Sequence, residues 1–241
     1  MNDDLEQLLT NLHLKTVAAR FDDYLAAADK DATPFPALFV QLLRAEWQAR
    51  QDNALSARIQ RAKMPEPWSL ESFPFKLQTG VNQRQIRSFA TLEFIPKAEN
   101  IVFVGATGVG KTGLACSLLL KAVQNGYRAL FIKAQDLFDE MYASLADRST
   151  RRLLKSLAKI DILCIDELGY INAKTEQTNI FFKLMEERHH RRPTIITTNL
   201  AYPEWQDLLG NRPLTEALLS RLRERCHTVK IDGPCLRVQQ G

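Results

Sequence analysis

The sequence predicts an α/β fold in which a parallel five-stranded sheet is sandwiched by helices and preceded by a small all-α domain. From residue 100 onward, short apolar segments alternate with longer stretches of helix-forming residues. These segments show no alternation with polar residues, which is typical of parallel strands covered on both faces. In residues 1–63, leucines recur at spacings of three and four residues, which is the period of a helix.

The N-terminal part is expected to form a helical domain over residues 1–63. Its apolar positions with helical spacing are Leu5, Leu8, Leu9, Leu12, Leu38, Leu42, Leu43, Trp47, Leu55 and Ile59. Residues 31–36 interrupt this pattern, and Thr33 followed by Pro34 is suited to cap and open the next helix. Residues 64–81 are rich in proline and aromatic residues, so we expect a non-helical linker there.

The C-terminal part, residues 82–241, is expected to contain the sheet and its helices. A short helix over residues 82–92 carries apolar residues at helical spacing and ends before Pro96. Strands are expected at residues 101–104, 128–132, 161–165, 194–198 and 227–231. Helices are expected near residues 111–124, 134–146, 149–158, 175–190 and 213–224.

The composition is that of an ordinary soluble globular protein, with 45% hydrophobic and 25% charged residues in a chain of 241. No apolar run approaches the ~20 residues that a membrane helix needs. The acidic N-terminus lacks the basic start and apolar stretch of a signal peptide. We therefore expect a cytoplasmic protein without a membrane segment. The four cysteines form no C-x-x-C pair and are expected to be reduced thiols.

Residues 105–112 spell Gly-Ala-Thr-Gly-Val-Gly-Lys-Thr, which matches the phosphate-binding loop pattern G-x-x-x-x-G-K-[ST]. An apolar strand precedes the loop and a helix follows it, which is the structural context that the motif requires. Backbone N–H groups and the helix N-terminus would cradle the phosphates of a bound nucleotide, either ATP or GTP. Lys111 would add a positive charge, and the hydroxyl of Thr112 would hold Mg²⁺. The expected nucleotide contacts are Gly105, Ala106, Thr107, Gly108, Val109, Gly110, Lys111, Thr112 and Gly113.

A second motif is the pair of carboxylates, Asp166 and Glu167, that follows the apolar strand at residues 161–165. Asp166 is suited to hold Mg²⁺ or its bound water and to orient Thr112, and Glu167 is suited to polarise an attacking water. An acidic pair at a strand end is also common as a merely exposed turn. Its position after a phosphate loop in the same alternating domain favours the catalytic interpretation, and Glu167 favours hydrolysis over transfer to a small molecule.

Two further residues are catalytic candidates. Asn199 follows the strand at residues 194–198, and parallel strands present their C-terminal ends to the ligand. Asn199 would thus reach the γ-phosphate or the attacking water, although a turn-forming role is the alternative. Arg221, near the end of the last long helix, is suited to serve a neighbouring subunit as an arginine finger, whose loss costs ~10³–10⁵ in rate. A solvated helix face is the alternative, and Arg223 and Arg225 remain further candidates for the finger.

These elements, in this order, resemble those of the AAA+ superfamily. Over nearly the whole chain, the sequence is similar to the IstB family, ATP-binding helper proteins of bacterial insertion sequences that are related to the DnaC helicase loader. The most specific segments are Asp166-Glu167-Leu168-Gly169-Tyr170 and Ile231-Asp232-Gly233-Pro234. The other matching segments are residues 82–94, 105–115, 134–140, 161–170, 197–199 and 203–205.

The resemblance implies an ATPase that assembles on double-stranded DNA as a homo-oligomer, a ring or spiral, and delivers or activates a partner transposase. It also implies the strand order of AAA+ ATPases. The chain departs from the family pattern at Ala106 and Thr107, where a proline is usual, and at Gly113, where histidine is frequent. Arg237 matches an arginine that could sense the nucleotide from a lid, but no substantial C-terminal lid is expected after it.

The net charge of +4 is modest, and the charges of residues 1–97 cancel, so the excess lies in the remainder of the chain. The candidates for DNA binding share one predicted helix and the turn before it: Arg148, Arg151, Arg152 and Lys155. Such contacts to phosphates are salt-dependent and carry little sequence information. A solvated helix face, or a subunit interface that meets Asp139 and Glu140, is the alternative. No aromatic residues are interleaved, which argues against base stacking.

The leading interpretation is therefore an ATP-dependent regulator of transposition. A replicative helicase loader of the DnaC type would share every catalytic residue and differ in the helical N-terminal domain, and a neighbouring transposase gene would separate the two. A small-molecule P-loop kinase is disfavoured by Glu167, Asn199 and Arg221. A scaffold that binds ATP without hydrolysing it finds no support, because no catalytic residue is missing.

Overall fold

The computed structural model describes residues 3–66 and 68–236, and the chain divides into two compact units between Ala57 and Arg58. The first unit contains α1 (Asp3–Asn11), α2 (Lys15–Lys30) and most of α3 (Phe35–Arg61). The leucine pattern of the sequence continues to Leu12, but the chain turns there, because His13 adopts a left-handed φ of 57°. The core of this unit consists of Leu9, Val17, Ala28, Leu38 and Leu42.

A buried carboxylate connects two helices of the first unit. Glu46 of α3 accepts hydrogen bonds through Oε2 from the backbone N–H groups of Thr16 (2.8 Å) and Val17 (3.2 Å), in the first turn of α2. Its Oε1 accepts a hydrogen bond from Arg50 Nε at 2.9 Å. The first N–H groups of a helix have no partner within the helix, and the helix dipole favours a negative charge there. Glu46 thus caps α2 from a neighbouring helix.

The second unit is built on a sheet of five parallel strands in the order β2-β3-β4-β1-β5. Its strands are β1 (Asn100–Gly105), β2 (Ala129–Lys133), β3 (Ile162–Asp166), β4 (Thr194–Thr198) and β5 (Cys226–Ile231). Every residue of β3 and β4 is buried, which explains why these strands are apolar except for three threonines in β4 and Asp166 at the end of β3. All five predicted strands are confirmed.

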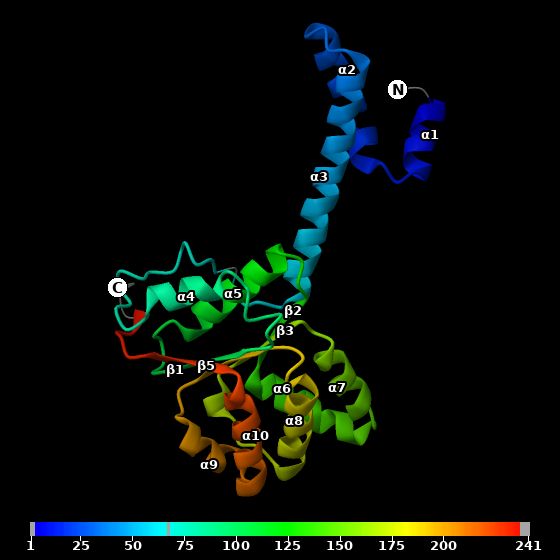
Figure 1. Ribbon diagram of the computed structural model, residues 1–241. Coiled ribbons are helices and arrows are strands. Elements are labelled where there is room, and N and C mark those ends of the chain that lie inside the picture. Colours follow the sequence, from blue (N-terminus) through cyan, green and yellow to red (C-terminus); the bar gives the residue numbers. More distant parts are fainter. Residues whose placement is uncertain (1–2, 67, 237–241) are drawn as a thin grey trace. The chain divides into compact units, whose positions relative to one another are not determined.

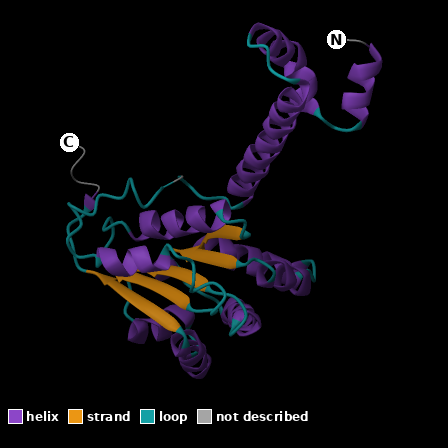
Figure 2. Cartoon of the chain, turned by 45° about the horizontal axis from the view of Figure 1, so that its top comes forward, coloured by secondary structure: helices purple, strands orange, loops and turns teal. Residues whose placement is uncertain are grey.

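Helices cover both faces of this sheet (Figures 1 and 2). One face carries α4 (Gln83–Phe89) and α5 (Lys111–Gln124). The other face carries α6 (Ala134–Ala146), α7 (Thr150–Ala158), α8 (Thr175–Arg188), α9 (Trp205–Leu209) and α10 (Arg212–Glu224). The predicted α/β sandwich is therefore confirmed. Helix α9 was not predicted, because five residues are too few to show a helical period, yet its Trp205 is fully buried.

The segment at residues 64–81, which we expected as a linker, lies within the second unit, and its Phe73 and Gln78 contact the phosphate loop. The Nε2 atom of Gln78, a fully buried side chain, donates hydrogen bonds to the carbonyl oxygens of Val109 (2.9 Å) and Pro234 (3.0 Å). Phe73 is also buried and lies against Gly110. This segment consequently helps to shape the nucleotide site.

All four cysteines are free thiols, as expected. Cys116 and Cys164 are buried, and burial raises the pKa of Cys116 to about 12, so its thiol stays protonated at neutral pH. Within the described part of the chain, no helix has the length and apolar character needed to cross a membrane.

Candidate nucleotide-binding site

The phosphate loop connects β1 to α5 at the C-terminal edge of the sheet. Its backbone turns through two left-handed glycines, Gly108 with φ 82° and Gly110 with φ 95°. A Cβ atom on Gly110 would also lie 2.8 Å from the ring of Phe73, so conformation and space both require glycine. This turn places the loop at the N-terminus of α5, where the helix dipole favours a phosphate group.

Lys111 bends back over the loop. Its Nζ atom donates hydrogen bonds to the carbonyl oxygens of Gly105 and Ala106, each at 2.8 Å. The ammonium group therefore lies at the mouth of the loop, where a bound nucleotide would place its phosphates.

Asp166 joins the phosphate loop to the middle of the sheet. The hydroxyl of Thr112 donates to its two carboxylate oxygens at 3.0 and 3.1 Å, and the hydroxyl of Thr197 donates to Oδ1 at 2.5 Å. Strand β4 separates β3 from β1, so Thr197 of β4 fills the space between the motifs that these two strands carry. Thr197 belongs to the family-like segment at residues 197–199, but the sequence predicts no role for its side chain at the site, because a threonine within a strand gives no distinctive signal.

Burial of Asp166, whose side chain is only 2% exposed, raises its pKa above the usual value. Hydrogen bonds from Thr197 and Thr112 oppose this shift, the charge of Glu167 adds to it, and Lys111 counteracts it. A buried carboxylate beside a hydroxyl group is a hard-oxygen donor set, which is the kind that Mg²⁺ prefers. Thr112 and Asp166 therefore fit the magnesium role that the sequence predicted.

Glu167 sits at a sharp turn of the backbone. It adopts a left-handed φ of 59°, and its N–H donates to Thr197 Oγ1 at 2.9 Å. The chain then enters a short 3₁₀ helix, Leu168–Tyr170. A non-glycine residue in this region is uncommon and costs energy, and such conformations cluster at functional sites. Thr197 thus holds the backbone of Glu167 and the side chain of Asp166 at the same time.

A pocket of about 490 Å³ lies over the phosphate loop. Its polar side includes Lys111, Thr112, Asp166, Glu167 and Asn199, so the predicted catalytic and metal-binding residues, except Arg221, meet in one place. Its other side is formed by residues that sequence reasoning missed: Pro65, Trp68, Phe73, Phe131 and Leu236. An apolar wall next to a phosphate loop offers a surface for the base of a nucleotide.

Two contacts close the outer side of this pocket. The hydroxyl of Tyr170 lies 2.5 Å from that of Thr107, so the turn after Glu167 touches the phosphate loop. Asn199 lies against Gly169, where any Cβ atom would collide with the Asn199 Oδ1 atom. Glycine at position 169 therefore leaves room for Asn199 at the pocket.

Arg221 lies outside this pocket, on α10. Its Nη2 atom is 3.5 Å from Glu186 Oε1, and its guanidinium group lies 4.8 Å from the centre of the Phe182 ring. Glu186 and Phe182 both belong to α8. The arginine is thus held on the α8–α10 surface, away from the phosphate loop of its own chain. Arg237, the other predicted nucleotide contact of the C-terminal tail, lies outside the described residues.

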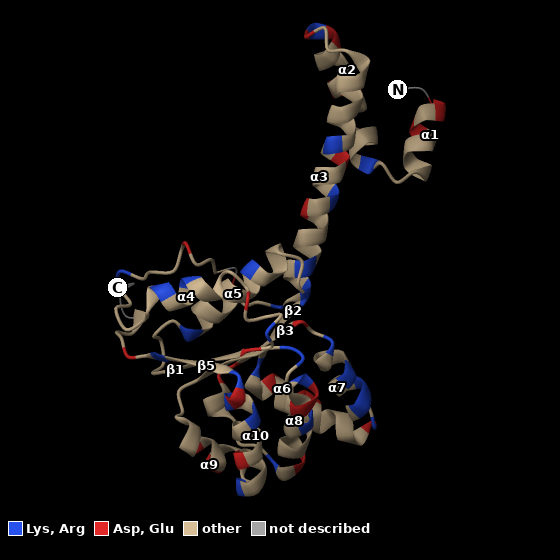
Figure 3. Cartoon of the chain, viewed as in Figure 1, with Lys and Arg blue, Asp and Glu red and all other residues tan. Residues whose placement is uncertain are grey.

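The predicted DNA-binding residues gather on α7 and the turn before it, where Figure 3 shows a concentration of positive charge. They line one shallow depression, formed by Arg148, Arg151, Arg152, Lys155, Ser156 and Lys159. Within the described residues, none of these five basic side chains takes part in an ion pair. The buried Arg188 caps the end of α7, because its Nη1 atom donates to the carbonyl oxygens of Leu157 (2.9 Å) and Ile160 (2.8 Å).

Comparison with known proteins identifies relatives over the whole chain. Residues 7–241 match the family described as IstB-like ATP binding protein. The chain is 30% identical over 237 residues to a protein of Pseudomonas aeruginosa named for ATP binding in insertion sequence IS21, an alignment that covers 98% of this chain and 89% of the relative. It is 31% identical over 242 residues to the corresponding IS232 protein of Bacillus thuringiensis subsp. berliner, covering 99% and 97%.

Solved structures share the fold at lower identity. The match to DnaI has a TM-score of 0.59 at 21% identity and covers 68% of this chain and 90% of that chain. The match to the DnaC helicase loader has a TM-score of 0.54 at 23% identity and covers 76% and 99%. AMPPCP-bound DnaA from Aquifex aeolicus matches with a TM-score of 0.58 at 20% identity, covering 70% and 51%. The fold is that of AAA+ proteins, and the chain belongs to the IstB-like ATP-binding protein family.

Proposed function

We propose that the protein is an AAA+ ATPase that regulates DNA transposition, assembles on double-stranded DNA and recruits or activates a partner transposase. The observation that carries this proposal is the hydrogen-bonded link from the phosphate loop through Thr112 and Asp166 to Thr197, with Glu167 held beside it. This arrangement supplies a phosphate cradle, an oxygen donor set for a cation and a carboxylate positioned to act on water.

In the proposed hydrolysis, five polar residues of the pocket have separate roles. Loop amides and Lys111 bind the β- and γ-phosphates, after Lys111 exchanges its backbone partners for phosphate oxygens. Thr112 and Asp166 would hold Mg²⁺, which would supply positive charge to neutralise the phosphate oxygens. Glu167 accepts a proton from the attacking water, and Asn199 orients that water or the γ-phosphate. Hydrolysis then resets the assembly.

The position of Arg221 supports a homo-oligomer. It lies on the α8–α10 surface and not among the residues that line the pocket of its own chain, as a finger that serves a neighbouring subunit would. We propose that neighbouring chains in a ring or spiral place Arg221 at each other's γ-phosphate, as an arginine finger.

The transposition role rests on the relatives at 30% and 31% identity, which are named for insertion sequences. With the DnaC helicase loader the chain shares only the fold, because an identity of 23% is too low to transfer a function. We therefore favour a transposase over a replicative helicase as the partner. An immediately adjacent transposase gene would support this choice.

DNA binding is the part of the proposal that a direct experiment can test. The basic residues on and beside α7 form a cluster that has no ion pair within the described part of the chain, so each contact to a phosphate of duplex DNA should release a counterion. The affinity for a duplex of random sequence, measured with ATP at several salt concentrations, should fall steeply with salt. Lys155→Ala should reduce the slope of log K against log salt by ~0.9. Lys183→Ala, an exposed lysine of α8, should leave the slope unchanged.

Equal slopes for the wild-type protein and the Lys155→Ala and Arg151→Ala variants would exclude α7 as the DNA interface. A requirement for one particular base sequence would also contradict a contact made only to phosphates.

A further inference from the structure

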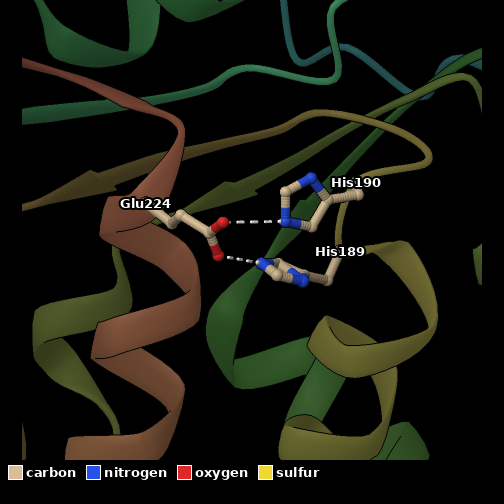
Figure 4. A group of neighbouring side chains, drawn as sticks. All are labelled: His189, His190 and Glu224. Atoms are coloured by element: carbon tan, nitrogen blue, oxygen red, sulfur yellow. Dashed lines mark hydrogen bonds and ion pairs between the residues drawn. The ribbon is translucent and has the colours of Figure 1, made fainter.

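Two adjacent histidines and a glutamate meet at a place that the proposed ATP chemistry does not use. His189 directly follows α8, His190 comes next, and Glu224 is the last residue of α10. The Nε2 atom of His189 lies 3.0 Å from Glu224 Oε2, and that of His190 lies 3.1 Å from Oε1. Figure 4 shows both imidazoles approaching the same carboxylate, each with its Nε2 atom turned toward it.

The backbone is shaped to bring both rings to one side. His190 adopts a left-handed φ of 56°, which is uncommon for a residue other than glycine. As a result, the two rings lie 4.0 Å apart between centroids and nearly perpendicular, with an interplanar angle of 79°. Consecutive side chains in an extended segment would point to opposite faces instead. The turn after α8 therefore brings both imidazoles to the carboxylate of Glu224. Two histidines that were merely exposed to solvent would not need this arrangement.

We propose that His189, His190 and Glu224 form a binding site for a divalent transition metal ion, with Zn²⁺ as the best-fitting ion. The three ligand atoms lie within 4.8 Å of one another, so small side-chain rotations bring them to the ~2.0–2.2 Å that zinc bonds require. Two imidazoles and one carboxylate are a frequent donor set for zinc, whereas Mg²⁺ prefers oxygen ligands. Each Nε2 would coordinate through its lone pair, with the ring proton on Nδ1.

The surroundings leave the site open to solvent. The side chains of His189, His190 and Glu224 are 23%, 37% and 53% exposed, so an ion can enter and water can occupy the remaining coordination positions. Two positive groups face His189, namely Arg221, which pairs with Glu186, and Arg225, which points to the carbonyl oxygen of Lys97. Their charge opposes a cation, so this site binds more weakly than one surrounded by acidic residues.

A bound ion would link the end of α8 directly to the end of α10. Arg221 and its partner Glu186 lie on these same two helices. The ion would therefore stabilise the helix pair that holds Arg221. Metal binding itself does not depend on the proposed ATPase function, so each can fail without the other.

The test uses the full-length protein, freed of metal and equilibrated with Zn²⁺ in the presence of excess Mg²⁺. We expect one equivalent of bound Zn²⁺ and a higher thermal unfolding temperature. Replacement by Co²⁺ should give a spectrum of nitrogen and oxygen ligands without thiolate-to-cobalt charge transfer. This spectrum separates the site from the partly exposed thiols of Cys226 and Cys235. A thiolate spectrum, or no bound Zn²⁺, would overturn the proposal.

The variants His190→Ala and Glu224→Gln should each weaken Zn²⁺ binding by at least ~10-fold, since even residues outside the ligand set cost 10–100-fold. His227→Ala is the matched control, because His227 also pairs with a carboxylate, Glu99 at 2.9 Å, but has no second histidine. Circular dichroism verifies the folding of each variant. Unchanged binding in both site variants, or an equal loss in His227→Ala, would place the metal elsewhere.

Discussion

Thr197 is the residue on which the geometry of the pocket depends. Its hydroxyl donates to Asp166 Oδ1 and accepts the N–H of Glu167, so one side chain serves both acidic residues. It is fully buried, and an unsatisfied partner at this position would be costly. The two carboxylates consequently differ in their surroundings: Asp166 is buried and hydrogen-bonded, whereas Glu167 borders the open pocket.

Replacement of Glu167 tests the catalytic base. Glu167→Gln keeps the size of the side chain but cannot accept a proton, so ATP and DNA binding should persist while turnover falls by ~10²-fold or more. Steady-state phosphate release and nucleotide binding measure the two quantities separately. Glu66→Gln is the matched control, because Glu66 is a second carboxylate among the residues that line the same pocket. Unchanged turnover in Glu167→Gln would remove this residue from the mechanism.

Replacement of Thr197 tests the positioning of Asp166. Thr197→Val keeps the shape but removes a hydrogen bond that lowers the pKa of Asp166, so that pKa should rise further. Because a cation binds the ionised carboxylate, the Mg²⁺ concentration for half-maximal turnover should increase ~10-fold or more. The acidic limb of the pH–rate profile should move to higher pH.

Thr197→Ser retains the hydroxyl group. Its Mg²⁺ concentration for half-maximal turnover and the acidic limb of its pH–rate profile should therefore lie close to the wild-type values. If Thr197→Val lowers turnover without changing the Mg²⁺ requirement or the pH profile, Thr197 has only a structural role.

At the scale of single residues, the sequence predicted the polar side of the pocket and missed the rest. Lys111, Thr112, Asp166, Glu167 and Asn199 follow strand ends or fit a spaced motif, and all of them line the pocket. The apolar wall escaped prediction because Pro65, Trp68 and Phe73 come from the segment at residues 64–81, and Phe131 and Leu236 come from β2 and the C-terminal tail, all far in sequence from the phosphate loop.

Among the helices, Glu46 of α3 caps the N-terminus of α2. The spacing of apolar residues could not predict this contact, because it joins two different helices. Burial by itself raises the pKa of Glu46, but hydrogen bonds from Arg50, Val17 and Thr16 outweigh it, and the net pKa lies below the usual value. A charged acceptor at the N-terminus of α2 also agrees with the helix dipole.

We expect Glu46→Gln to destabilise α2 by about 1–3 kcal/mol at neutral pH, because it removes a charge-assisted acceptor from a buried position. Since the folded pKa lies below the unfolded one, this stabilisation is complete above the unfolded pKa of about 4.3. It is lost as the pH falls through the folded pKa. Hydrogen exchange of the α2 amides, followed as a function of pH, measures the free energy of local opening.

Glu6→Gln serves as the control for this experiment, since Glu6 is an exposed residue of α1. Its effect should stay within about 0.5 kcal/mol. If the protection of α2 in the wild-type protein and in Glu46→Gln shows the same pH dependence, Glu46 is not the group that caps this helix.

The start of a helix could be predicted from the sequence where a capping side chain marks it. Helix α4 begins after Asn82, whose side chain accepts from the N–H groups of Arg84 (3.1 Å) and Gln85 (3.2 Å), and the sequence placed that start correctly. The break between α1 and α2 was missed, because Leu12 continues the apolar spacing and the turn at His13 carries no glycine or proline. Hydrophobic period alone does not reveal such a turn.

For the whole molecule, the alternation of strands and helices was sufficient to predict the parallel sheet, but not the strand order. In the order β2-β3-β4-β1-β5, the phosphate loop and the acidic pair lie on strands separated by β4. Only the three-dimensional arrangement shows that Thr197 spans this gap and that Arg221 is remote from the pocket. The remote position of Arg221 supports the proposal that a second subunit completes the active site.

Arg221→Ala tests this shared site. The variant should bind ATP normally as a monomer but lose oligomer-dependent turnover by ~10³-fold or more. A mixture of Arg221→Ala and Glu167→Gln chains should regain part of the turnover, because an interface can combine Glu167 from one chain with Arg221 from the other. Arg212→Ala is the control, because Arg212 is another arginine of α10 and pairs with Glu216 at 3.0 Å. An inactive mixture, or equal loss in monomer and oligomer, would exclude the finger role.

The central claim is that ATP hydrolysis depends on assembly along DNA. The most direct measurement is ATP turnover per chain with and without duplex DNA, over a range of protein concentrations and at two salt levels. We expect stimulation by DNA that rises steeply with protein concentration and fades at high salt. Turnover that is independent of DNA and of protein concentration would contradict it and would indicate a self-contained P-loop enzyme.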